Sequence, residues 1–160
     1  MKKIFGLVVM AMSMLFTANA MASTGVESVD AVTSTADYDG DYDGVISNVT
    51  MNGKSYSNED ATFTIESNVL ICDFPQIGKM PGTITVELPI SINEATGEIT
   101  ATPGTSAGSL TLKFGGTAKL YLDSLTNAKV ENGTLEFEVH GTYLSIIKFP
   151  ASFHFKGTLK

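Results

Sequence analysis

Hydrophobic and polar residues alternate along most of the chain beyond residue 42. The stretch GTITVELPISIN (82–93) is the clearest case, because isoleucine, valine and leucine occupy every second position and mostly polar residues lie between them. In a β-strand, a period of two places one set of side chains in the core and the other in water. No stretch keeps a helical period for more than about two turns. The pattern therefore predicts an all-β protein.

The same alternation selects the side chains that we expect to face the core. Pro89 has no backbone N–H, so we expect the strand that contains it to lie at a sheet edge or to be kinked there. The predicted inward residues are Ile84, Val86, Leu88, Ile90 and Ile92; Ala61, Phe63 and Ile65; Leu110, Leu112 and Phe114; Leu135, Phe137, Val139 and Tyr143; and Ala151, Phe153, Phe155 and Leu159.

Turn signals divide this pattern into strands. Asn52-Gly53 and Asn132-Gly133 are two-residue hairpin signals, because both central residues of such a turn adopt φ > 0. Gly115-Gly116 interrupts a longer run, as a bulge or a sharp bend within one strand does. The predicted strands are 42–51, 55–66, 68–74, 82–92, 97–103, 109–122 (bent), 126–131, 134–145 and 151–159.

Successive strands of this kind form a meander, which must protect its edges by closing on itself or by packing as two sheets. We predict a single antiparallel up-and-down β-barrel of about eight strands. A two-sheet β-sandwich is the alternative.

The chain begins with the features of a secretory signal peptide. Lys2 and Lys3 precede an apolar run (4–16), and small residues follow it. The run is too short to span a bilayer comfortably, and we predict cleavage after Ala22, with Ala20 as the second choice. No cysteine lies near this point, so no lipid anchor is expected. We expect an exported protein, periplasmic or secreted.

We predict three segments: a signal peptide (1–22), a flexible acidic leader rich in Ser and Thr (23–41) and a barrel domain (42–160). The formal net charge is -7, and loss of two lysines with the signal peptide makes it -9. A nucleic-acid-binding protein needs a basic face for phosphates, so nucleic acid and anionic membrane surfaces are poor partners. No later run is long and apolar enough for a membrane-spanning helix.

Five segments resemble a known family. They are YDGVISNVTMNG (42–53), ATFTIE (61–66), NVLICDF (68–74), MPGTITVELPI (80–90) and FPASFHFKGTL (149–159). They are similar to the calycin-like, lipocalin-like secreted β-barrel domains of gut Bacteroidetes, over residues 42–159. The resemblance implies an antiparallel barrel of about eight strands in a family without an established activity, and it carries over no functional residue.

The candidate chemistry of the cysteine and the histidines is limited. Cys72 lies in an apolar run, and we interpret it as an inert core thiol. His140 and His154 share the parity of polar residues, which predicts solvated histidines within reach of each other and of Glu138. Two histidines and one carboxylate do not make a zinc site, which needs three or four ligands. Glu136 and Glu138 are interpreted as a solvated face.

The stretch DYDGDYDGV (37–45) resembles half of a calcium loop. With Asp39 in the first position, Asp41, Asp43 and Gly44 also match. Thr50 stands where the loop needs a bidentate carboxylate, and no helices are predicted on either side. We therefore assign no metal or cofactor, although a weak calcium site formed by the three aspartates stays open.

Three short patterns remain. Asn48-Val49-Thr50 and Asn132-Gly133-Thr134 match the N-glycosylation pattern, and we interpret both as chance matches. Asp123-Ser124-Leu125 is similar to a short O-glycosylation pattern of exported Bacteroidetes proteins. No nucleophile, base and metal set can be assembled, and Ser109 and Ser124 have no identifiable base, so we predict that the protein is not an enzyme.

Two function hypotheses follow. The first is an exported, non-catalytic binding domain that holds a small apolar or amphipathic ligand in or at the mouth of the barrel. The second is a structural or interaction protein of the cell envelope, with a filled barrel that binds protein or glycan through its surface. A closed cavity of about 300 Å³ or more, lined by Phe63, Phe114 and Phe137, favours the first. The small inward residues leave room for a cavity or mark tight contacts: Ala61, Ala101, Ala118, Ala151, Gly141 and Gly157.

Overall fold

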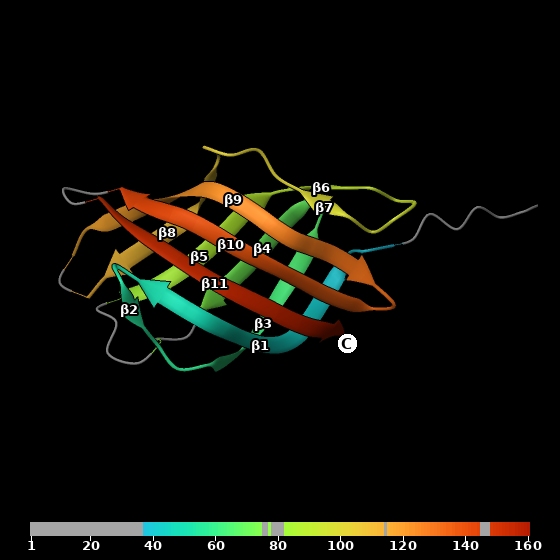
Figure 1. Cartoon of the computed structure of the whole chain (residues 1–160), viewed down its shortest axis with the longest axis horizontal. Helices are drawn as coiled ribbons and strands as arrows, with labels where there is room; N and C mark the ends of the chain where they lie inside the picture. Colours follow the sequence, from blue (N-terminus) through green and yellow to red (C-terminus); the bar gives the residue numbers. More distant parts are fainter. Residues whose placement is uncertain (1–36, 75–76, 78–81, 114, 145–147) are drawn as a thin grey trace, which may run out of the picture. The chain divides into compact units, whose positions relative to one another are not determined.

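A computed structural model describes residues 37–160 apart from 75–76, 78–81, 114 and 145–147 (Figure 1). The predicted signal peptide and residues 23–36 of the predicted leader lie outside the described residues. Within the described part of the chain, all regular structure is β-strand. The strands are β1 (Gly40–Met51), β2 (Lys54–Ser55), β3 (Glu59–Glu66), β4 (Val69–Phe74), β5 (Gly82–Pro89), β6 (Ser91–Ile92), β7 (Ile99–Thr100), β8 (Ser106–Leu112), β9 (Thr117–Glu131), β10 (Thr134–Leu144) and β11 (Lys148–Leu159).

Eight long strands form one closed antiparallel β-barrel, as predicted. Neighbours in the barrel follow one another in sequence, apart from two insertions: the short strand β2 lies between β1 and β3, and the β6–β7 hairpin lies between β5 and β8. The first and last strands close the barrel, with Tyr42 opposite Leu159 and Ile46 opposite Phe155. A sandwich would leave these strands unpaired, so the alternative fold is excluded. Closure also explains how the meander protects its edges.

The predicted division into strands is wrong in the third quarter of the chain. Gly115 and Gly116 both have positive φ and connect two antiparallel strands, β8 and β9. They do not bend a single strand. The predicted break near residues 123–125 is instead part of β9, which stays paired with β10 across two register shifts. Asn127, in this region, has a φ of 53°, a conformation that asparagine tolerates better than most residues.

Other boundaries differ less. The predicted strand 55–66 is split into β2 and β3, and only Ile99–Thr100 of the predicted strand 97–103 is regular. β5 ends at Pro89, so the predicted break at this residue is confirmed. β5 pairs with β4 on one side and β8 on the other, so the alternative prediction of an edge strand is wrong. β1 begins at Gly40, which pairs with Ile65, two residues earlier than predicted.

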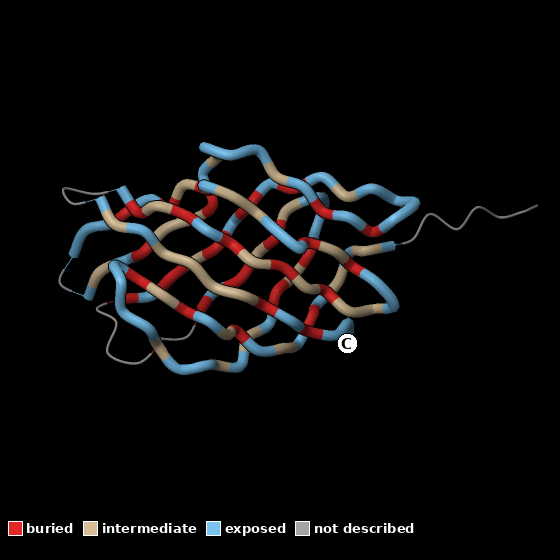
Figure 2. Tube along the Cα trace, viewed as in Figure 1, coloured by how far each residue is buried: buried red, intermediate tan, exposed pale blue. Residues whose placement is uncertain are grey.

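The core lies inside the barrel, and burial alternates along the strands as expected (Figure 2). The inward prediction is confirmed for most residues. The prediction is wrong for Leu159, which is exposed at the end of β11. Five further residues are half-buried against the core: Ala61, Ile92, Leu112, Ala151 and Phe153. Phe114 lies outside the described residues.

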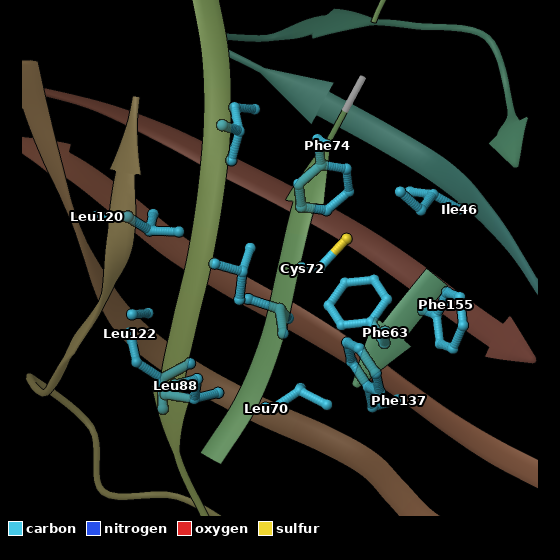
Figure 3. Packing of buried hydrophobic residues seen from close by; sticks show 14 of the residues in the cluster. Ile46, Phe63, Leu70, Cys72, Phe74, Leu88, Leu120, Leu122, Phe137 and Phe155 are labelled. Atoms are coloured by element: carbon cyan, nitrogen blue, oxygen red, sulfur yellow. The ribbon is translucent and has the colours of Figure 1, made fainter. Parts of the chain in front are cut away.

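Phenylalanine rings fill the middle of the barrel (Figure 3). Phe63 is fully buried, and its ring centroid lies 4.5 Å from that of Phe155, 5.0 Å from that of Phe137 and 5.7 Å from that of Phe74. Several of these contacts are edge-to-face, the arrangement that the ring quadrupole favours. The rings therefore occupy the space in which a ligand would have to lie.

The inward glycines mark close contacts. A Cβ at Gly157 would lie 2.8 Å from the Asp43 carbonyl oxygen, and a Cβ at Gly141 would lie 2.8 Å from Leu120 Cδ1. Both distances are below the van der Waals contacts of packed atoms. Gly157 therefore marks a tight contact between strands, whereas Gly141 both makes a close contact and, like Ala151, lines the small interior cavity.

Candidate functional site

The interior offers only a small space. A cavity of about 20 Å³ lies among apolar side chains, including Phe74, Tyr143 and Phe153. This volume suits about one water molecule. Phe63 and Phe137 pack against each other and line no part of it. The barrel is therefore filled by the side chains of the described residues. A ligand would need a cavity of about 300 Å³, and Phe63 and Phe137 do not line one.

A row of polar side chains crosses the outer face where β1, β11 and β10 lie side by side. The hydroxyl of Ser47 lies 3.1 Å from His154 Nδ1, and His154 Nε2 lies 3.1 Å from Glu136 Oε1. Lys156 Nζ donates to Glu136 Oε2 at 2.8 Å. The barrel closure produces this row, because it places Ser47 opposite His154 on the adjacent strand. Sequence analysis missed Ser47, and only the pairing of the first and last strands would have identified it.

The order serine, histidine, carboxylate is the connectivity of a nucleophile, a base and an orienting group. A reaction also needs a cleft for the substrate and donors for a developing oxyanion. Neither Ser47 nor His154 lines the cavity described above or the groove described below. We therefore interpret the row as a hydrogen-bonded ladder that joins three strands at the closure of the barrel.

Glu136 gives this ladder a pH dependence. The hydrogen bond from Lys156 lowers the pKa of its carboxyl most, and the hydrogen bond from His154 lowers it further, below the ordinary value of 4.5. A carboxyl whose pKa is lowered by folding stabilises the folded state at any pH above its unfolded-state pKa. This stabilisation is lost as the pH falls through the lowered pKa of the folded state.

We expect wild-type protein to be more stable than Glu136→Gln at neutral pH, by less than about 1 kcal/mol because the pair is largely exposed. The difference should decrease as the pH falls below 4.5 and vanish once the pH is below the lowered pKa of the folded state. Thermal unfolding across this range measures it. Lys156→Met should reduce the same pH dependence. Parallel curves for wild type and Glu136→Gln would contradict the assignment.

The two histidines differ. His140 is exposed, as predicted, and its Nε2 lies 3.0 Å from Glu138 Oε1. His154 is not a solvated histidine, because Ser47 and Glu136 flank it and its side chain is only 25% exposed. His154 contacts Glu136, whereas the sequence predicted that it would lie near Glu138. Within the described ranges, no group of three or more His, Cys, Asp or Glu residues is arranged to hold a metal ion.

Two of the aspartates in the opening stretch lie along a strand, and Asp39 precedes it and accepts a hydrogen bond from the Ser67 N–H at 3.3 Å. Asp41 and Asp43 are on the outer face of β1, and each accepts a hydrogen bond from the threonine opposite it on β3, Thr64 or Thr62. The bond from Thr62, followed by that from Lys160, lowers the pKa of Asp43. Alternate residues of a strand project in parallel about 6–7 Å apart, so these carboxylates do not converge as in a calcium loop.

Cys72 lies in the core between β3 and β5, and Figure 3 shows it among the phenylalanine rings. Burial, and to a smaller extent the charge of Asp73, raises the pKa of its thiol to about 12. A reactive cysteine is exposed and has a lowered pKa. The position therefore has the features of an inert core thiol.

An open groove of about 1070 Å³ runs along the outer face near the β6–β7 hairpin. The hairpin forms one wall, and residues of β9, β10 and β11 form the other. The lining residues are Thr96, Glu98, Ile99, Thr100 and Ala101 on the hairpin side, and Leu125, Asn127, Ala128, Lys129, Glu131, Asn132, Thr134, Glu136 and Lys156 on the barrel side.

The hairpin wall is held to β9 at two points. The Val130 N–H donates to the Gly97 carbonyl at 2.9 Å, beside an isolated bridge between Glu98 and Lys129. At the other end, the Gly104 N–H donates to the Leu122 carbonyl at 2.7 Å. Between Leu122 and the bridge at Lys129, the strand pairings of β9 are with β10 among the described strands. The groove therefore opens where two tied segments separate.

The three glycosylation-like patterns lie on the surface. Asn48 is exposed in β1, with a φ of 53°, and Asn132 lies in the exposed turn between β9 and β10. Ser124 is half-buried in β9, opposite His140. These positions do not by themselves indicate modification.

Comparison with known proteins gives no relative: no family model, curated protein or solved structure matches the chain. In the part of the chain that the structure describes, no helix has the length and apolar character needed to cross a membrane. The site must therefore be interpreted from its own geometry.

Proposed function

We propose that this protein is an exported, non-catalytic interaction module of the cell envelope. In this proposal, a filled calycin-like barrel acts as a rigid support and binds protein or glycan through its outer surface. The observation that carries the proposal is the packing of Phe63 against Phe137 and Phe155, which leaves about 20 Å³ of free interior. The large concave surface is outside the barrel and polar, whereas small-molecule sites are mostly apolar and enclose their ligands.

A second candidate keeps the small apolar or amphipathic ligand and places it at the mouth of the barrel. It rests on the apolar lining of the small cavity, which includes Met51, Phe74 and Phe153. Such a ligand would have to displace side chains that are already in contact, at a cost similar to that of other overpacking changes in cores.

One experiment separates the two candidates. Wild-type protein, purified from its host under native conditions, is analysed by native mass spectrometry, and the same protein is immobilised and exposed to solubilised envelope fractions. We expect retention of an envelope component that protease or periodate treatment of the fraction abolishes. A lipid or metabolite bound at one copy per chain, with no envelope component retained, would support the second candidate and refute the first.

A further inference from the structure

We infer that Asn52 is a site of spontaneous deamidation, in which its side-chain amide becomes a carboxylate through a cyclic imide formed with the backbone nitrogen of Gly53. The fold protects the second Asn-Gly pair of the chain, Asn132-Gly133, from the same reaction. This inference is independent of the proposed function. It makes the turn between β1 and β2 a modification site.

The chemistry of the step follows from the Asn-Gly sequence. The backbone nitrogen of Gly53 attacks Asn52 Cγ, a C–N bond forms, and the side-chain nitrogen leaves as ammonia with the proton that Gly53 loses. Water then opens the imide at either carbonyl and gives aspartate or isoaspartate. The net reaction consumes water and releases ammonia, without oxidation or reduction. Glycine favours the attack because it has no Cβ to crowd its nitrogen.

Both Asn-Gly pairs form tight turns that resist this reaction while they stay closed. The φ angles are 50° at Asn52 and 51° at Asn132, and both glycines also have positive φ. In this left-handed region ψ is about +30 to +60°. The glycine nitrogen and the asparagine Cβ then lie on opposite sides of the Cα–C bond, whereas the imide ring requires them on the same side. Each turn must therefore open before its asparagine reacts, and the rate of reaction depends on the free energy of opening.

Few contacts keep the turn at Asn52 closed. The strand that follows it, β2, has two exposed residues, which pair only with the end of β1 among the described strands. One further backbone bond, from the Tyr56 N–H to the Val49 carbonyl at 2.9 Å, closes this hairpin. A Cβ at Gly53 would have no atom within 4 Å, so the glycine can change conformation without a clash.

A backbone hydrogen bond holds Asn52 itself without opposing the reaction. The Asn52 N–H donates to the Pro150 carbonyl on β11 at 2.9 Å. The peptide that must rotate joins Asn52 to Gly53 and lies on the other side of the Asn52 Cα. The bond to Pro150 can therefore persist while the turn opens.

The turn at Asn132 is held on more sides. It joins β9 and β10, which have 15 and 11 residues, and β10 also pairs with β11 along its other edge. The Gly133 carbonyl accepts a hydrogen bond from the Leu159 N–H at 2.8 Å, and a Cβ at Gly133 would lie 4.0 Å from Leu159 Cβ. Opening this turn disturbs more contacts, so its free energy of opening is higher and its asparagine reacts more slowly.

Peptide mapping of the folded wild-type protein, incubated in heavy-oxygen water at slightly alkaline pH, provides the test. Mass spectrometry measures the converted fraction at each asparagine, and incorporated heavy oxygen identifies conversion that took place during the incubation. We expect Asn52 to convert at least about tenfold faster than Asn132. In denaturant, where neither turn is formed, the two asparagines should convert at similar rates.

Two variants assign the site in the intact protein. Isoelectric focusing should show an acidic species that accumulates in wild type and in Asn132→Gln and is lost in Asn52→Gln. A smaller ratio of the two rates in the folded protein would overturn the inference, because the two turns would then open with similar ease. A ratio that is as large in denaturant would also overturn it, because the flanking sequence and not the fold would then set the rates. Persistence of the acidic species in Asn52→Gln would assign the reaction to another residue.

Discussion

Replacing Phe63 with alanine is expected to lower the free energy of unfolding by about 3–5 kcal/mol, the largest single effect that we predict. Phe63 has no exposed surface and contacts the rings of Phe74, Phe137, Phe153 and Phe155. The variant loses the transfer free energy of the ring and retains a cavity, because strands of a closed barrel cannot move together freely to fill it. Denaturant unfolding measures the change at equilibrium.

Two controls define this result. Phe63→Leu keeps most of the volume and should cost less, about 1–2 kcal/mol. Val45→Ala removes an exposed side chain, 42% accessible, on the outer face of β1 and should change stability by less than about 0.5 kcal/mol. If Phe63→Ala costs no more than Val45→Ala, the barrel is not filled by this ring and the second function candidate gains support.

The second large effect is expected at the closure of the barrel. Gly44 lies opposite Gly157, and a Cβ at Gly44 would lie 2.1 Å from the Lys156 carbonyl oxygen and 2.4 Å from Gly157 Cα. These are backbone atoms, which cannot rotate away as a side chain can. We expect Gly44→Ala to destabilise the protein by about 1–3 kcal/mol and to increase hydrogen exchange of the β1 and β11 amides.

The direction of this change is informative. At a strand position without a close neighbour, Gly→Ala stabilises a protein by about 0.4–1 kcal/mol, because it restricts the unfolded chain. Gly104→Ala is a contrasting control. Gly104 has a φ of +82° and no atom lies within 4 Å of the added Cβ, so its cost reflects the φ angle alone, whereas Gly44 has no positive φ and its cost reflects the close contact. A stabilising Gly44→Ala would show that β1 and β11 are not packed as closely as described.

The candidate site depends on contacts that no local pattern contains. Sequence analysis placed Glu136, Glu138 and His140 correctly on the outer face, because parity along one strand determines the face. It expected His154 in water near Glu138, but parity says nothing about the neighbouring strand. The register of β10 with β11 and the closure of β1 on β11 place His154 between Glu136 and Ser47.

The groove has the same origin. Residues 106–121 separate Ile99–Thr105 from Leu122–Val130 in the sequence, and the pattern of neither segment indicates the other. Pro89 ends β5 and begins the excursion that forms the β6–β7 hairpin, a break that was predicted from its missing N–H. Hydrogen bonds at Gly97 and Gly104 hold this hairpin against β9. These contacts are seen only in the folded chain.

By itself, the sequence determined that the chain is built of antiparallel β-strands and which face of most strands is buried, because a period of two is a local property of each strand. It favoured a barrel over a sandwich, and the pairing of β1 with β11 decided between them. The tertiary structure alone decided that Gly115-Gly116 is a hairpin, that the barrel is filled and that the accessible groove is outside it. Free volume and cross-strand contacts depend on register and on how facing side chains interdigitate. These quantities arise between strands and are not encoded within any one of them.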